Sequence, residues 1–238
     1  MSTITLFKME TLPSKLDVIY KLSNEKKDGF WFKAKPSRYD ENEVQVEIWY
    51  EEDLEAGMKR VFSDCAYEMI EYLKERGKEK IIKKVYCFIN LKLKTLEIYR
   101  GADHITQRIK EIMEELLEVS LTPVSLNSSQ LLLIVKENST ELKQAMFKYV
   151  HGLFYHIIRG RHLENNEKYR EYLKAKPDSL RMISVIPKIR YLNGGYMVTI
   201  NGDKGTIKMS NSMIKWRPRF EVRQIVSLVV SATGLTSF

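Results

Sequence analysis

The sequence predicts an α+β fold with a largely antiparallel sheet or sheets and three to five packed helices. Segments in which apolar and polar residues alternate come in groups, and segments with helical spacing separate these groups. Turn signals typical of hairpins join several pairs of neighbouring strands. With 238 residues, 44% of them hydrophobic, the chain is long enough to bury a full core.

Strands are predicted throughout the first third of the chain. Residues 15–22 alternate loosely, and residues 29–35 contain the aromatic cluster Phe30-Trp31-Phe32. Residues 43–50 alternate cleanly between apolar and polar side chains, so they present one apolar face and one polar face. The polar residues between positions 36 and 42 favour a turn that joins the last two of these strands.

Helices dominate the prediction for the middle of the chain. Apolar residues recur every three to four positions from 54 to 73, which predicts a helix that ends at Gly77. The sequence Ser139-Thr140-Glu141 is typical of a helix start, and the helical spacing after it continues to Gly160. The same criteria predict strands over residues 81–90, 95–99 and 131–135, and helices over residues 103–119 and 139–160.

The last third returns to strands and closes with a helix. Pro187 interrupts one of the strands and favours a place at a sheet edge, because proline donates no ladder hydrogen bond. Residues 201–205, with two glycines, an asparagine and an aspartate, are a strong hairpin signal. The predicted elements are a helix over 164–175, strands over 181–192, 196–200 and 206–209, and a helix from 222 to Gly234.

The domain organisation follows from one polar stretch, residues 162–178, which is the best candidate for a division. Residues 1–161 then form a near-neutral mixed α/β portion, and residues 162–238 form a basic portion with a β-hairpin and a carboxyl-terminal helix. No linker rich in proline, glycine or serine separates the two. A single continuous domain is therefore the alternative.

Positive charge is concentrated in the last hundred residues. Met1 to Glu137 hold 22 Lys and Arg against 24 Asp and Glu, a balance of −2. Asn138 to Phe238 hold 17 against 7, a balance of +10, and the two counts add to the 39 and 31 of the whole chain. Such asymmetry favours a polyanionic partner, whereas a solvated basic surface with no such partner is the plain alternative.

No motif with recognised catalytic chemistry is present. The chain lacks a GxxxxGK[ST] loop, a GxGxxG loop between strand and helix, and a GxSxG elbow. Its four histidines and two cysteines do not have the spacing of a metal site, and carboxylates are scarce after Asn138. We expect no metal, no cofactor and no catalytic residues, although an enzyme of unfamiliar type stays open.

The compartment is predicted to be the cytoplasm. Cys65 and Cys87 fall in segments of different predicted type, so each is expected to be a small reduced hydrophobe. Charged residues near the amino terminus exclude a signal-peptide core there, and no apolar run reaches the roughly 18–20 residues that span a bilayer. We therefore expect no membrane partner.

The strongest candidate site is a basic surface with aromatic residues in the last third. The segment Lys215-Trp216-Arg217-Pro218-Arg219-Phe220 interleaves cations with aromatics. Arginine donates two hydrogen bonds to a phosphate, and an exposed aromatic ring stacks on a base, whereas a buried Trp216 or Phe220 would instead anchor the core. The predicted nucleic-acid-binding residues are Arg159, Arg161, Lys188, Arg190, Lys204, Lys208, Lys215, Trp216, Arg217 and Arg219.

The leading hypothesis is a non-enzymatic nucleic-acid-binding protein that contacts DNA or RNA through this basic carboxyl-terminal surface. The alternative is a protein–protein adaptor or structural subunit of an intracellular complex. In that case the amino-terminal portion would meet a protein partner, and the aromatics Phe30, Trp31, Phe32, Trp49 and Tyr50 would be candidates for the interface, unless they simply form the core.

Overall fold

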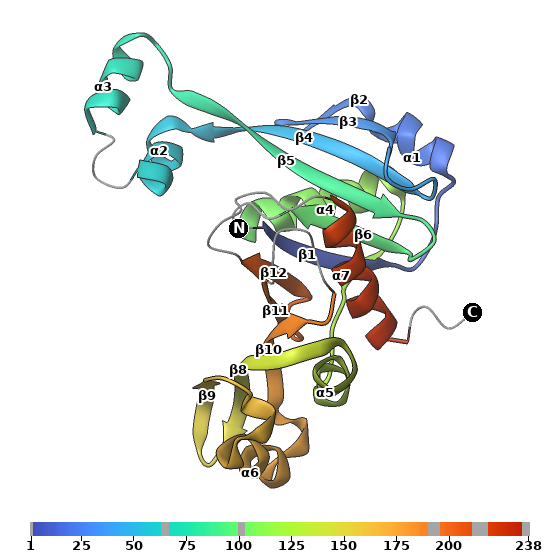
Figure 1. The fold of residues 1–238 in the computed structure, drawn as a ribbon. Helices are drawn as coiled ribbons and strands as arrows, with labels where there is room; N and C mark the ends of the chain where they lie inside the picture. The colour runs from blue at the N-terminus through green and yellow to red at the C-terminus, as the bar shows by residue number, and fades with distance from the viewer. Residues whose placement is uncertain (1, 63–66, 100–102, 190–195, 211–218, 235–238) are drawn as a thin grey trace.

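The twelve strands of the described residues belong to one antiparallel sheet, with the spatial order β2-β3-β4-β5-β6-β1-β12-β11-β10-β8-β9 and β7 paired to part of β1 (Figure 1). The computed structural model describes residues 2–62, 67–99, 103–189, 196–210 and 219–234. Seven α-helices accompany the sheet in these residues. The predicted fold class was wrong, since one sheet dominates the protein and the helices exceed the expected three to five.

The first half of the chain forms one end of the sheet. Its strands β4 and β5 make a long ribbon, and helices α2 and α3 project from the body at the tip of that ribbon (Figure 1). The elements are β1 (Ser2–Met9), α1 (Lys15–Leu22), β2 (Ser23–Lys27), β3 (Phe30–Pro36), β4 (Glu43–Asp53), α2 (Leu54–Phe62), α3 (Tyr67–Glu75), β5 (Lys80–Asn90), β6 (Thr95–Tyr99), α4 (Asp103–Leu117) and β7 (Leu121–Pro123).

The second half forms the other end, and its last helix returns to the first half. Strand β12 pairs with β1, so the two halves share a continuous ladder. The elements are α5 (Ser128–Asn138), β8 (Ser139–Val150), β9 (Leu153–Arg159), a short turn Leu163–Asn165, α6 (Glu167–Ala175), a second turn Pro177–Ser179, β10 (Leu180–Pro187), β11 (Met197–Asn201), β12 (Thr206–Ser210) and α7 (Arg219–Ala232).

Two hydrophobic clusters lie on opposite faces of the sheet, and β1 contributes to both. Ile4 and Leu6 join the cluster under α5, α6 and α7, whereas Phe7 and Met9 join the cluster under α1 and α4. This division follows from the alternation of side chains along a strand. The first cluster takes residues from both sides of position 162, where the sequence suggested a division.

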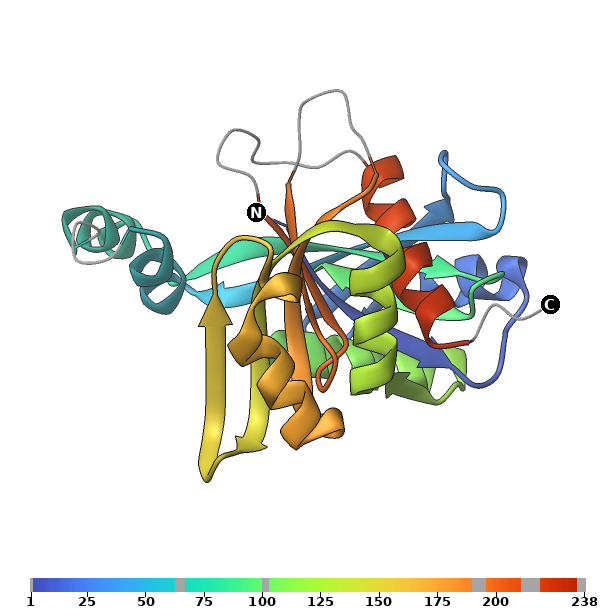
Figure 2. The ribbon, with the colours of Figure 1, turned by 60° about the horizontal axis from the view of Figure 1, so that its bottom comes forward.

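Among the described residues, each half of the sheet is covered on one face, and its other face is open, except that the start of α7 contacts β4, β5 and β6 in the first half. Helices α1 and α4 cover one face of strands β2 to β5. The opposite face of these strands is on the same side of the sheet as α7. Strands β8 to β12 are covered on the α7 side and open on the α4 side. Figure 2, which turns the bottom of the molecule forward, shows α5 and α6 over the second half and α7 beside α5, toward the first half.

Three segments have a different secondary structure from the predicted one. Residues 15–22 form helix α1, in which the Ser14 side chain accepts a hydrogen bond from the Asp17 amide at 3.1 Å. Residues 131–135 lie within α5, which begins with a capping box of Asn127 and Gln130. Residues 139–160 form the β8–β9 hairpin. Its turn, His151-Gly152, has positive φ angles of 49° and 74°, which interrupt any helix.

Other predicted elements are confirmed close to their bounds: β3, β4, β5, β6, α4, α6, β11, β12 and α7. The helix predicted over residues 54–73 corresponds to α2 and α3, between which residues 63–66 lie outside the described part. The strand with Pro187 is not at an edge, because β10 lies between β8 and β11 and Pro187 is its last residue. No helix in the described ranges has both the length and the apolar character that crossing a membrane requires.

Candidate nucleic-acid interface

The six predicted binding residues that the structure describes do not form one surface. Arg190, Lys215, Trp216 and Arg217 lie outside the described residues. Five others are exposed in the second half of the sheet: Arg159, Arg161, Lys188, Lys204 and Lys208. Arg219 is buried in the interior, and Phe220 beside it is 48% exposed at the start of α7.

Arg159 and Lys208 share the open face of the second half. The register runs across the sheet from Arg159 through Gln144, Ser184 and Thr199 to Lys208, so all five side chains point to the same side. Four strand spacings of about 4.8 Å separate the two cations by roughly 19 Å. The row between them is polar and uncharged, with a hydrogen bond of 2.8 Å between the hydroxyls of Ser184 and Thr199.

Lys188 and Lys204 lie at opposite ends of the eight-residue strand β10, roughly 20 Å apart at about 3.3 Å per residue. The ammonium of Lys188 donates to the backbone oxygen of Glu137 at 2.6 Å, at the carboxyl end of α5. Lys204 is in the β11–β12 turn beside Asp203, which pairs with Lys148 and Arg181. The structure therefore brings Arg159 and Lys208 onto one face but separates Lys188 from Lys204.

Arg219 was predicted to bind nucleic acid at the surface, but its side chain is buried. Its guanidinium donates to Glu97 at 2.5 and 2.8 Å and to the Tyr99 hydroxyl at 3.2 Å, and it also binds Glu43. Glu43 and Glu97 are 0% and 1% exposed. The guanidinium carbon lies 3.9 Å from the centre of the Phe88 ring. Arg219 therefore fixes the start of α7 to β4, β5 and β6 and is not available to a phosphate.

Burial controls the protonation of this buried ionic cluster. Removal from water, together with repulsion from Glu43, raises the pKa of Glu97 in spite of the attraction of Arg219. Burial and the Glu97 charge also raise the pKa of the Tyr99 hydroxyl. Burial alone would lower the pKa of Arg219, but the attraction of Glu97 raises it, so Arg219 stays charged. The cluster thus holds α7 against the sheet with a permanent cation.

A different surface combines aromatic rings with cations: the open face of β2 to β5. One row of cross-strand partners runs from Lys26 through Trp31 and Trp49 to Lys84. A second row runs from Lys33 through Glu47 to Tyr86, and Lys35 begins a third. We call this surface the aromatic-basic face, and its members are Lys26, Trp31, Lys33, Lys35, Glu47, Trp49, Lys84 and Tyr86.

The lysines of the aromatic-basic face lie against its rings. The Lys26 ammonium is 5.0 Å from the centre of the Trp31 ring, and the Lys84 ammonium is 4.8 Å from that of Trp49 and 4.7 Å from that of Tyr86. The three rings are partly exposed. In such cation–π contacts the ammonium lies over the face of the ring and is attracted to it.

Glu47 is the acidic member of the face and is largely shielded from solvent. Its carboxylate lies 2.7 Å from the Lys35 ammonium and 2.5 Å from that of Lys84. Hydrogen bonds from Lys35 and then from Lys84 lower the pKa of Glu47, so it is ionised at neutral pH. One carboxylate thus orders two of the four lysines without neutralising the face.

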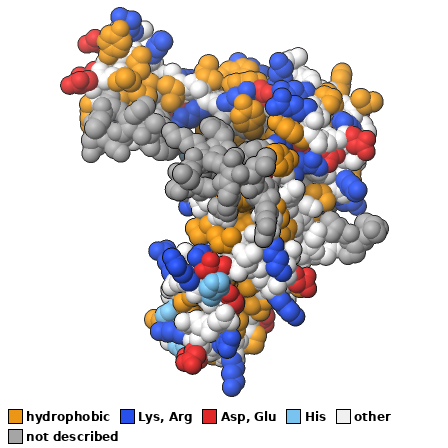
Figure 3. Space-filling model, in the orientation of Figure 1, with side chains coloured by type: hydrophobic (Ala, Val, Ile, Leu, Met, Phe, Trp, Pro, Cys, Tyr) orange, Lys and Arg blue, Asp and Glu red, His pale blue; other side chains and the backbone are white. Residues whose placement is uncertain are grey.

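Alternation divides the aromatics of the first third between two environments. Phe30, Phe32 and Tyr50 are 7%, 1% and 3% exposed and belong to the core under α1 and α4. Trp31 and Trp49 have the opposite parity and lie on the aromatic-basic face. Figure 3 shows hydrophobic and basic side chains mixed on the upper part of the molecule, where Figure 1 draws β3, β4 and β5. The period-two pattern at these positions is the sequence signal that could have identified the face.

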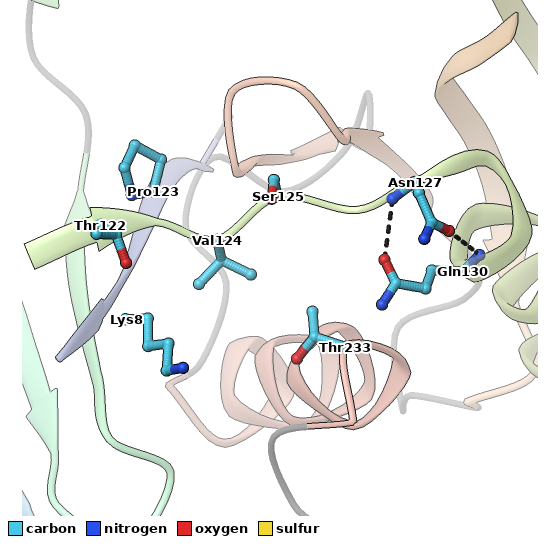
Figure 4. A pocket seen from close by; sticks show the side chains of 8 residues that line it. All are labelled: Lys8, Thr122, Pro123, Val124, Ser125, Asn127, Gln130 and Thr233. Atoms are coloured by element: carbon cyan, nitrogen blue, oxygen red, sulfur yellow. Dashed lines mark hydrogen bonds between the residues drawn. The ribbon is translucent and has the colours of Figure 1, made fainter. Parts of the chain in front are cut away.

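A hollow of about 330 Å³ lies between β1, the segment before α5 and the end of α7 (Figure 4). Its polar groups serve the fold: the Asn127 amide donates to the Gln130 side chain at 2.9 Å, and the Gln130 amide donates to Asn127 at 2.9 Å. Lys8 is its single charge. The lining residues are Lys8, Thr122, Pro123, Val124, Ser125, Asn127, Gln130 and Thr233.

The described residues offer no metal site, since no three His, Cys, Asp or Glu side chains among them are placed to hold an ion. Cys87 is buried and unbridged, and burial raises the pKa of its thiol, whereas Cys65 lies outside the described residues. Comparison of the chain with protein-family models and with curated proteins gives no match.

Proposed function

We propose that the protein binds single-stranded nucleic acid on the aromatic-basic face. The observation that carries this proposal is the cross-strand pair Trp31 and Trp49, partly exposed in the middle of the face with a lysine against each ring. Bases of any sequence stack on such rings, and lysines beside them neutralise the phosphates. An aromatic sheet surface is a common means of holding single-stranded RNA.

The spacing of the face suits an extended strand. Directly paired residues such as Trp31 and Trp49 have Cβ atoms about 5 Å apart, and Lys33 and Lys35 lie about 6.7 Å apart along β3. Stacked bases would occupy the tryptophan row, and the backbone would follow the lysines of β3. A duplex would hide its base faces from the rings, so we expect single strands to bind more tightly.

This proposal moves the site from the carboxyl-terminal third to the amino-terminal third. Lys208 is paired with Thr3, and Thr3 shares the α4 side of the sheet with Phe7. Arg159 and Lys208 therefore lie on the side of the sheet opposite to the aromatic-basic face. A role for them in binding would need a second site.

The experiment is a titration of labelled mixed-sequence RNA and DNA oligonucleotides, followed by fluorescence anisotropy at low and moderate salt. Trp31→Ala and Trp49→Ala should each cost on the order of 1–3 kcal/mol of binding free energy, mostly for single strands. Lys33→Ala and Lys35→Ala should each flatten the salt dependence by about one unit. The matched control is the pair Arg159→Ala and Lys208→Ala, which should leave the affinity unchanged.

Two results would contradict the proposal. Binding that is undetectable at both salt concentrations would remove nucleic acid as a partner. Binding that survives both tryptophan substitutions but is lost in the Arg159→Ala and Lys208→Ala control would return the site to the carboxyl-terminal surface. Circular dichroism of each variant separates lost affinity from lost fold.

A role as subunit of an intracellular complex is the second candidate function. It is favoured by the apolar side chains that the β8–β9 hairpin exposes, among them Leu153 at 50% and Phe154 at 58%. The buried thiol of Cys87, free of any bridge, supports the cytoplasm as the compartment for either function.

A further inference from the structure

The two edges of the sheet differ in how they are protected from pairing. The edge strand β2 has a register shift between Ser23 and Lys26, a left-handed residue at Asn24 with φ 59°, and charges at Glu25, Lys26 and Lys27. Bulges and charges, lysine above all, are the usual means by which proteins block an exposed edge. Strand β2 is therefore poorly suited to pair with another chain.

The opposite edge strand, β9, lacks these means. Its register with β8 runs without a shift from Gln144 opposite Arg159 to Val150 opposite Leu153. Its sequence Leu-Phe-Tyr-His-Ile-Ile-Arg contains no proline and one formal charge, which is at its end. Tyr155 is 51% exposed and Ile157 is 46% exposed. An edge strand without a bulge, largely apolar and charged only at its last residue, is a surface that another strand covers.

We propose that β9 pairs antiparallel with β9 of a second copy of this chain, about a two-fold axis that passes beside His156. Alternate residues of β9 direct their backbone N–H and C=O groups away from β8, and these groups would complete the ladder between the copies. The two sheets would join into one. In Figures 1 and 2 β9 is the outermost strand of its end of the sheet.

The sequence of β9 fits a copy of itself in the register centred on His156. Tyr155 of one copy then lies opposite Ile157 of the other, and Phe154 lies opposite Ile158. Pairs of an aromatic with a β-branched side chain are among the favourable cross-strand pairs. Arg159 lies opposite Leu153, so the charged ends of the strands do not meet. An isologous interface of this kind closes as a dimer.

Side chains of the edge pack against one another and against α6. The Phe154 ring packs edge-on against Tyr149 at 4.9 Å and against Tyr155 at 4.7 Å between ring centres. Behind the strand, the Tyr172 hydroxyl of α6 lies 3.1 Å from Nε2 of His156. A preformed edge loses little conformational entropy on pairing, which favours association.

The test is the oligomeric state of nuclease-treated protein, measured by sedimentation equilibrium over a range of concentrations. The full chain should form a dimer. Tyr155→Glu and Ile157→Lys should each raise the dissociation constant at least about tenfold, because each places two charges against apolar partners. Since Tyr155 of one copy opposes Ile157 of the other, an equimolar mixture of the two variants should form a heterodimer at lower concentration than either variant alone.

The control is Tyr20→Glu, the same change at a tyrosine of α1 that is 86% exposed and remote from β9. It should dimerise like the unchanged protein. A chain that is monomeric at every concentration, a dimer that persists in both β9 variants, or a mixture that shows no heterodimer would each overturn the proposal. Circular dichroism confirms that the variants fold, and both substituted side chains are about half exposed.

Discussion

Replacement of Arg219 by methionine tests the buried ionic cluster at the start of α7. The side chain of Arg219 is 4% exposed, and it is hydrogen-bonded to two carboxylates that are 0% and 1% exposed. Arg219→Met leaves Glu43 and Glu97 buried without this cation. Breaking a buried pair by removing one partner costs about 3–5 kcal/mol of unfolding free energy. For a chain of this size that lowers the melting temperature by on the order of 10 °C.

The cost should depend on the carboxylates left behind. The triple variant Arg219→Met, Glu97→Leu and Glu43→Gln removes both buried carboxylate charges, of which that of Glu43 also lies 3.7 Å from Arg223. It keeps an acceptor for Ser37, whose hydroxyl donates to Glu43 at 2.7 Å. Apolar replacement of a buried ionic group is often neutral or stabilising. The triple variant should therefore regain most of the loss. Arg108→Met removes an exposed pair with Asp28 and Glu111, and this control should change stability little.

The pH dependence of the loss follows from the raised pKa of Glu97. A carboxyl whose pKa is higher in the folded state than in the unfolded state binds more protons when the protein is folded. It therefore lowers the free energy of unfolding as the pH rises above the ordinary pKa of a glutamate, near 4.5. Without Arg219 the pKa of Glu97 rises further, because the attraction of the guanidinium that lowers it is lost. The deficit of Arg219→Met should therefore be larger at pH 7.5 than at pH 4.5.

Urea unfolding followed by far-ultraviolet circular dichroism at the two pH values measures the deficit. If the unfolding free energy of the variant lies within about 1 kcal/mol of that of the unchanged protein at pH 7.5, the structural role of Arg219 is refuted. Such a small loss is far below the cost of breaking a buried ion pair. Equal deficits at both pH values would refute the assignment of the pH-dependent part of the cost to charged Glu97.

Two further changes test the aromatic-basic face and a tight turn. Glu47→Gln removes the carboxylate between Lys35 and Lys84, so it should strengthen oligonucleotide binding in anisotropy titrations and lower the melting temperature at pH 7. Because the pKa of Glu47 is lowered in the fold, the loss of melting temperature should fade as pH falls below about 4.5. Gly205→Ala should cost roughly 2–3 kcal/mol in urea unfolding, since φ is +59° and a Cβ would lie 2.6 Å from the Val124 oxygen. Gly29→Ala, with φ +79° and nothing within 4 Å, is its matched control and should cost less.

Local signals were sufficient where a segment's own residues decide its structure. The clean alternation of residues 43–50 predicted β4, and the turn over residues 201–205 predicted the β11–β12 hairpin. In α4 the apolar spacing was confirmed by burial of Ile109, Ile112 and Met113 on one face. Each of these patterns is much stronger for one secondary structure than for the other.

The β8–β9 hairpin could not be predicted in the same way. Residues 142, 146, 149, 150, 153 and 157 match helical spacing, and Ser139-Thr140-Glu141 matches a helix start. Pairing of β8 with both β9 and β10 overrides these preferences. The misassignment also hid the free edge, because no part of a predicted helix can be an edge strand.

The candidate site was missed for a related reason. The sequence separated two faces of β3 and β4 by parity, but it could not say which face helices cover. In the fold, α1 and α4 cover the side of Phe32 and Ile48 and leave Trp31 and Trp49 open. On the open side α7 reaches β4 through Arg219, which lies 176 positions from Glu43 in the sequence. Arg219 and Phe220, the last two residues of the basic segment that suggested a binding surface, therefore begin the helix that covers part of the sheet. Trp31 and Trp49 lie beyond the reach of this helix and stay partly exposed.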